Sequence, residues 1–167
     1  RSRETEAEPF RPVLTTNFKE GVSFATFTPD NKLVYAITNL GRDKSALVLM
    51  DPATCEELEQ LYTNDKYDLG GLWYSDAQKK LLGVSYEGHK TRYFFDKATE
   101  EMLGRMERHL RGYEIGIGGS NKAEDKYIVY AGGDRTMGAY YFYDVKSDTM
   151  TKLADLAPWI DEQQMAE

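Results

Sequence analysis

A threefold repeat constrains the fold of this chain more than any other feature of its sequence. Each copy contains a polar turn, an apolar run, a polar loop and a second apolar run that ends at an aspartate. The closing aspartates are 45 and 48 residues apart: Asp51, Asp96 and Asp144. A fixed period of this length, with about four short strand signals in each copy, is typical of the blades of a β-propeller.

The sequence therefore predicts an all-β fold, a partial β-propeller of about three four-stranded antiparallel blades with an extra N-terminal strand. The three blades are expected at about 23–62, 71–107 and 115–154. Residues 1–9 are expected to be a disordered lead-in, 10–154 the propeller segment and 155–167 a linker. The extra strand is expected within Phe10–Phe18, where Pro12 favours an edge position.

The strands of each predicted blade follow from the apolar runs and the turns between them. Their ranges are 23–28, 33–38, 45–51 and 56–62; then 71–75, 80–86, 91–96 and 101–107; then 115–119, 127–131, 138–144 and 149–154. Leu33–Thr38 is apolar at successive positions, so both of its faces are expected to be buried, as in a sheet that lies between two others. The fourth strands are more polar, as outer edges facing water should be.

A helix competes with the fourth strand in two of the three copies. Cys55–Tyr62 and Lys97–Arg111 both have enough helix-forming residues to be helical on propensity alone. Their equivalent in the third copy, Thr149–Leu153, is rich in β-forming residues. The repeat therefore favours strands at all three places.

Composition and charge exclude several classes of function. The chain has 167 residues, long enough for a sizeable core, and a formal net charge of −7 with acidic and basic residues interleaved. This pattern argues against nucleic acid, which needs a basic face, and against an anionic membrane surface. No apolar segment approaches the roughly 18 residues that span a bilayer. The single cysteine, Cys55, excludes an internal disulfide framework.

The start of the chain is polar, of mixed charge and without methionine or a leader pattern, which suggests a sequence trimmed from something longer. The compartment, periplasmic or cytoplasmic, stays open.

No catalytic or metal-binding pattern emerges from the sequence. Gly83-Val84-Ser85-Tyr86-Glu87 comes nearest to the Gly-x-Ser-x-Gly elbow of serine hydrolases, but Glu87 replaces the second glycine and Ser85 falls inside a predicted strand. His89 and His109 lack the spacing of zinc ligands. We therefore expect no catalytic residue, no metal and no cofactor in this chain.

Two other motifs have simple structural interpretations. Gly116-Ile117-Gly118-Gly119 lacks the lysine and the following helix of a phosphate-binding loop, so small residues in an innermost strand are the better interpretation. Trp73 and Tyr74 lie in a predicted first strand and are expected to pack between sheets, although with Trp159 they could instead form a binding platform.

Three arginines recur in the loop between the second and third strands of the copies: Arg42, Arg92 and Arg135. Such loops gather at one end of a propeller, where they could bind a peptide terminus or steer an acidic substrate. The alternative is that they are solvated loop tips or pair between blades, each pair contributing under about 1 kcal/mol.

The blade openings resemble a known family. Phe27-Thr28-Pro29-Asp30-Asn31-Lys32-Leu33-Val34-Tyr35-Ala36 resembles the F-S-P-D-G-K-x-I-x-Y opening of blades in the prolyl oligopeptidase family (S9 serine peptidases) and in TolB-like propellers. Leu14–Gly21 is similar to the entry into such a blade, and Leu49–Thr54 to its D-x-x-T-G turn, with Cys55 in place of glycine. The tail Leu156–Ala166 is similar to the link from an S9 propeller, of the acylaminoacyl-peptidase or dipeptidyl-peptidase type, to its hydrolase domain.

The resemblance implies a non-catalytic propeller that gates access of peptides to a Ser-Asp-His triad beyond Glu167. Its partners would be the α/β-hydrolase domain of the same parent chain and peptide substrate, with neither nucleic acid nor membrane involved. The alternative is a TolB- or WD40-like propeller that acts as a protein-binding scaffold. Because an open arc exposes apolar faces at both ends, we also expect the isolated chain to self-associate.

Overall fold

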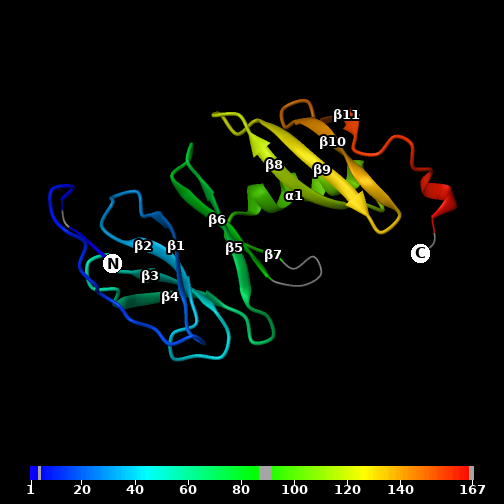
Figure 1. Ribbon diagram of the computed structural model, residues 1–167. Helices are drawn as coiled ribbons and strands as arrows, with labels where there is room; N and C mark the ends of the chain where they lie inside the picture. The colour runs from blue at the N-terminus through cyan, green and yellow to red at the C-terminus, as the bar shows by residue number, and fades with distance from the viewer. Residues whose placement is uncertain (4, 87–91, 166–167) are drawn as a thin grey trace. The chain divides into compact units, whose positions relative to one another are not determined.

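The chain folds into three antiparallel sheets of four, three and four strands, with one α-helix among the residues described (Figure 1). The computed structural model describes residues 1–3, 5–86 and 92–165. Two compact units divide the chain, Arg1–Tyr93 and Phe94–Glu167. The all-β expectation holds in this coarse form: strands dominate, and they form three separate sheets.

The first sheet is a meander whose central strands are apolar on both faces. Its strands, in spatial order, are β1 (Val22–Phe27), β2 (Val34–Thr38), β3 (Ala46–Met50) and β4 (Glu57–Thr63). On one face Ala36, Val48 and Met50 are fully buried, and Val13 and Leu14 of the N-terminal segment pack against this cluster. The other face carries Leu47, which is also fully buried. This confirms the prediction of two-sided burial for the central strands.

The second sheet covers that other face. It consists of β5 (Leu69–Ser75), β6 (Lys80–Tyr86) and β7 (Arg92–Phe94). Leu47 forms a buried cluster with Leu69 and Val84, and Tyr35 of β2 lies 6.0 Å from Tyr74 of β5 between ring centroids. Tyr74 thus packs between sheets, as its position in a first strand predicts.

The third sheet forms the second unit together with the helix. It is a meander of β8 (Glu114–Ser120), β9 (Lys126–Gly133), β10 (Thr136–Asp144) and β11 (Thr149–Asp155), preceded by α1 (Lys97–His109) and followed by the 3-10 turn η1 (Glu162–Gln164). Gly116, Gly118 and Gly119 lie in β8, as expected for a strand rather than a phosphate-binding loop.

The hairpin turns repeat in their chemistry as well as in their sequence. Asp51 accepts hydrogen bonds from the backbone N–H groups of Ala53 and Thr54, and Asp144 accepts from Lys146 and Ser147. The fourth residue after each aspartate, Cys55 or Asp148, has a positive φ of 60° or 51°. A side-chain-capped turn followed by a left-handed residue reverses the chain into the next strand.

The strand predicted at 101–107 is wrong, because Lys97–His109 is an α-helix. Asp96 makes the same kind of bond as Asp51, accepting from the Thr99 N–H at 2.9 Å, but here it caps the first turn of a helix. In the residues that follow, the buried side chains recur every three or four positions, as in a helix, and not at every second position, as in a strand. They are Thr99, Leu103, Met106 and Leu110. The helix propensity of Lys97–Arg111 thus predicts this element correctly, and its place in the repeat does not.

The second copy consequently has three strands instead of four. The loop at 87–91, which contains His89, lies outside the described residues. Phe10–Phe18 forms no strand in the described structure; it contributes one antiparallel bridge between Arg11 and Ser2.

The helix is tied to the third sheet by a polar cluster around Tyr143, which is fully buried in β10. The Tyr143 hydroxyl donates to Asp148 at 2.6 Å, and His109 Nε2 lies 3.2 Å from the same carboxylate oxygen. Burial and the hydrogen bond to Asp148 raise the pKa of Tyr143 to about 12. The end of α1 and the β10–β11 turn are thus held by a single carboxylate.

The amphipathic packing of α1 generates a stability prediction. Leu103→Ala removes a side chain that is 3% exposed, so it should lower the free energy of unfolding of the second unit by about 2–5 kcal/mol. Leu153→Ala is the matched control, because Leu153 lies in the same unit and is 55% exposed; it should cost less than about 0.5 kcal/mol. Urea unfolding followed by circular dichroism measures both, and equal losses would contradict the packing of α1 described above.

Candidate functional site

Arg42, the first of the three predicted loop arginines, pairs within its own sheet. Its Nη2 donates to both carboxylate oxygens of Glu57, at 2.8 and 2.6 Å, and the two side chains are 25% and 28% exposed. Glu57 begins β4. The pair is a partly buried structural contact between the β2–β3 loop and β4 of the same sheet, so Arg42 is neither a solvated loop tip nor paired with another sheet.

Arg92, the second arginine, begins β7 and lies over an aromatic ring. Its guanidinium carbon is 5.3 Å from the centroid of the Trp73 ring in β5, within the range of a cation–π contact. Trp73 therefore packs against a side chain of its own sheet. Arg42 and Arg92 belong to the first unit and Arg135 to the second, and a single site shared by all three stays a prediction.

Arg135, the third arginine, lines a polar cavity of about 200 Å³ in the second unit, which we name the Tyr113 pocket. Three segments distant in sequence form it: the turn between α1 and β8, the β9–β10 hairpin and η1. Its lining residues are Arg111, Gly112, Tyr113, Gly133, Asp134, Arg135, Thr136 and Glu162.

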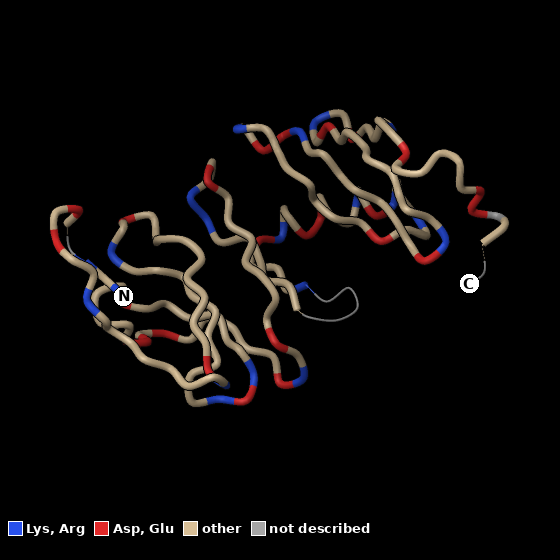
Figure 2. Tube along the Cα trace, in the orientation of Figure 1, with Lys and Arg blue, Asp and Glu red and all other residues tan. Residues whose placement is uncertain are grey.

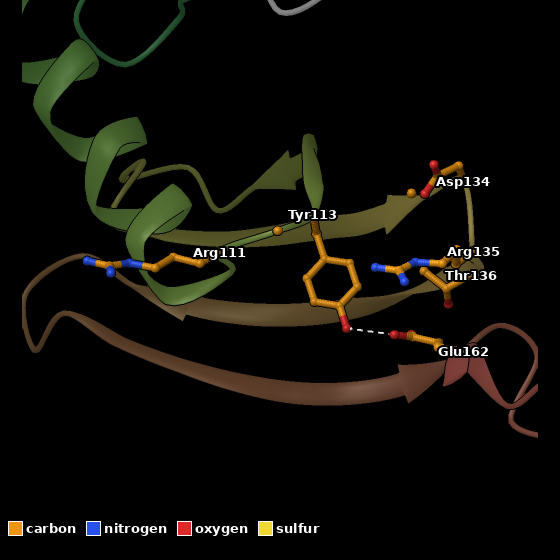
Figure 3. A pocket seen from close by; sticks show the side chains of 8 residues that line it. Arg111, Tyr113, Asp134, Arg135, Thr136 and Glu162 are labelled. Carbon is orange, nitrogen blue, oxygen red and sulfur yellow. Dashed lines mark hydrogen bonds between the residues drawn. The ribbon is translucent and has the colours of Figure 1, made fainter. Parts of the chain in front are cut away.

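The centre of the pocket is a hydrogen bond between Tyr113 and Glu162 (Figure 3). The Tyr113 hydroxyl donates to Glu162 Oε2 at 2.9 Å. The same view shows the Arg135 side chain directed toward Tyr113 and the Arg111 side chain directed away from it. The hydrogen bond to Glu162, followed by burial, raises the pKa of Tyr113 above its ordinary value of 10.0. Tyr113 therefore stays a neutral hydrogen-bond donor at physiological pH.

The local backbone explains how the segments meet. Gly112 adopts a φ of +89°, a conformation that side-chain-bearing residues rarely adopt, and the next N–H, of Tyr113, donates to the Leu110 carbonyl at 3.2 Å. This turn after α1 brings Tyr113 to the start of β8. At the hairpin, the Thr136 hydroxyl accepts from the Gly138 N–H at 3.1 Å. A Cβ on Gly138 would lie 2.5 Å from the Ala131 carbonyl oxygen, so β9 and β10 can approach here only with glycine.

The charges lining the pocket are balanced, with two arginines and two carboxylates. A guanidinium can bind a carboxylate, and the acids can accept from an ammonium group. The volume is below the roughly 300–1,000 Å³ of drug-sized sites, so the pocket suits a small group such as the end of a peptide.

Arg135, which the sequence indicates as a candidate, lines this pocket, whereas Tyr113 and Glu162 are not indicated by the sequence. The sequence indicates Arg135 because its loop recurs in the repeat. Glu162 belongs to the segment that was predicted to be a linker, and nothing in the sequence pairs it with a tyrosine 49 positions earlier.

Acidic and basic residues are interspersed along the trace of each unit (Figure 2). In the part of the chain that the structure describes, no three His, Cys, Asp or Glu side chains are arranged so that they could hold a metal ion. The helices found there are too short or too polar to cross a membrane.

Comparison of the chain with known protein families, with curated proteins and with solved structures found no match in any of the three.

The Tyr113–Glu162 bond generates a titration prediction. Because the pKa of Tyr113 is raised, its hydrogen bond to Glu162 stabilises the fold fully at pH values below the ordinary tyrosine pKa. This stabilisation is lost as the pH rises through the raised pKa of Tyr113. Glu162→Gln removes the carboxylate that favours the neutral phenol, so the pKa of Tyr113 should fall toward 10.0. NMR titration of ¹³C-labelled tyrosine measures the shift. Asp161→Asn, which removes the neighbouring charge, is the control and should leave the Tyr113 titration unchanged; an equal shift in both variants would rule out a specific bond.

Proposed function

We propose that this chain is the non-catalytic β-propeller portion of an S9-like serine peptidase, in which it gates the entry of peptides and forms part of the wall of the substrate chamber. The observation that carries the proposal is the recurrence of one four-stranded meander, with the same capped turns at Asp51 and Asp144, in the first and third sheets. A propeller is built from such a unit.

The face-to-face packing of the first two sheets also supports the proposal. Blades lie side by side with apolar faces in contact, and Leu47, Leu69 and Val84 form such a contact between neighbouring copies of the repeat. Helix α1 occurs in the sequence where the outer strand of the second blade is expected, so the second copy of the repeat is a three-stranded sheet followed by a helix.

Within this function, the Tyr113 pocket is the candidate peptide contact. Arg135 would bind the terminal carboxylate of a peptide, while Tyr113 donates its single hydroxyl proton to Glu162 and forms part of the pocket wall. Such a contact would orient short peptides, which have an accessible terminus, and not internal loops of folded proteins.

The identity of the parent protein can be tested with a fluorophosphonate probe, which labels activated serines. The translation product of the complete reading frame that contains this chain should be labelled at a Gly-x-Ser-x-Gly serine outside residues 1–167, and the 167-residue chain alone should not be labelled. A complete reading frame that lacks any labelled serine would favour the scaffold alternative. Labelling within residues 1–167, with contaminants excluded, would overturn the non-catalytic assignment.

The pocket contact has a separate test. A short peptide with a free carboxylate should bind the chain more tightly than its C-terminal amide, measured by chemical-shift perturbation. Arg135→Gln should weaken binding of the free acid by about tenfold to a hundredfold, the range expected for a hydrogen bond to a charged group. Arg108→Gln, an exposed change on α1 outside the pocket lining, is the matched control and should leave binding unchanged. Equal affinity for acid and amide would contradict the role of Arg135.

A further inference from the structure

The third sheet has one face on which apolar and aromatic side chains are partly exposed. We name it the outer face and define it by Ile128, Tyr130, Tyr140 and Phe142. The register of β9 and β10 places Ile128 opposite Phe142 and Tyr130 opposite Tyr140, so the four side chains share one face. Ile128 is 36% exposed and Tyr140 is 39% exposed. The alternate residues of these strands, among them Val129 and Ala139, are buried on the other face.

Three glycines leave room for side chains of the outer face to lie against the backbone of the third sheet. A Cβ on Gly132 or on Gly138 would meet the Tyr130 ring, and a Cβ on Gly118 would lie 3.5 Å from Ile128 Cγ2. The Tyr130 hydroxyl donates to the Met137 carbonyl at 3.1 Å, and its ring meets that of Tyr140 edge to face at 5.9 Å. The central tyrosine is therefore held in place, and the face is an ordered surface.

The repeat shows what covers the equivalent face elsewhere in this chain. Counted from the closing aspartates Asp51 and Asp144, Leu47 corresponds to Tyr140 and Leu49 to Phe142. In the first sheet Tyr35 is opposite Leu49 and Ile37 is opposite Leu47, the same arrangement as the four outer-face residues. That face of the first sheet is covered by the second sheet, and Leu47 is fully buried there.

From this correspondence we infer that the outer face is a docking surface for another sheet of the same kind, which a second copy of the chain supplies. The four defining side chains carry no charge, so two outer faces can meet without like-charge repulsion despite the net charge of −7. A twofold contact brings the same patch of each copy together, and offset aromatic rings suit such a contact. Sheets that pack face to face lie about 10 Å apart, a spacing that side chains of this size fill.

Sedimentation velocity of the 167-residue chain at micromolar concentrations tests the inference. The chain should form a dimer, and Tyr140→Glu should raise the dimer dissociation constant by at least about tenfold, because it would bury a carboxylate in the contact. Ile128→Glu, on the neighbouring strand, should have the same effect and serves as a second variant if the first does not fold. Circular dichroism identifies the folded variants.

Phe24→Glu is the control, since Phe24 is 50% exposed on β1 of the first sheet and lies outside the outer face. This variant should dimerise as the wild-type chain does. A wild-type chain that sediments as a monomer would overturn the inference. So would a dimer that is lost in Phe24→Glu but kept in Tyr140→Glu and Ile128→Glu.

Discussion

The structure depends on central strands that are apolar on both faces. A strand of this kind cannot lie at a surface with one side in water, because each buried aliphatic side chain contributes about 1.5–3 kcal/mol only when it is covered. In the first sheet, Val48 and Leu47 are neighbours in β3 that point to opposite faces, and both are fully buried. The N-terminal segment covers one side and the second sheet the other. Layering of sheets follows from this one constraint.

The second unit meets the same constraint with a helix. Val129 and Tyr143 are fully buried on the face of the third sheet that α1 contacts through His109. A helix can replace a sheet as the cover because burial depends on the area removed from water and not on the type of element that removes it. This also explains why the repeat is recognisable in the sheets but not in what lies between them.

The sheets could be predicted from the sequence because their determinants are local. Asp51 and Asp144 each cap a turn two or three residues away, and the apolar runs between turns set the strands. The same local chemistry misled the interpretation at Asp96, where an aspartate followed by Lys-Ala-Thr caps a helix. The residues after the turn decide whether a strand or a helix follows. After Asp96, the apolar residues Leu103, Met106 and Leu110 have helical spacing, and a comparison of the turn sequences alone does not include them.

The candidate site could be predicted only where a loop recurs. Arg135 is visible in the repeat, whereas the Tyr113–Glu162 bond joins two segments that approach each other only once the third sheet has formed. The partner of Arg42 was missed for the same reason, since Glu57 begins a strand that the sequence presents as a polar edge. Non-local pairs of this kind follow from topology, and the sequence contains no signal for them until the sheet order is known.

The pocket and the outer face use different residues of one strand. Thr136, at the start of β10, lines the pocket. Further along the strand, Tyr141 is opposite Val129, which is buried on the other face of the sheet from the outer face. Tyr140 and Phe142, the residues before and after Tyr141, point to the outer face, because side chains alternate along a strand. A ligand in the pocket and a sheet on the outer face would then contact separate parts of β10. The buried Tyr143 and its bond to Asp148 anchor the same strand in the core of the second unit, so one anchored strand contributes to both surfaces.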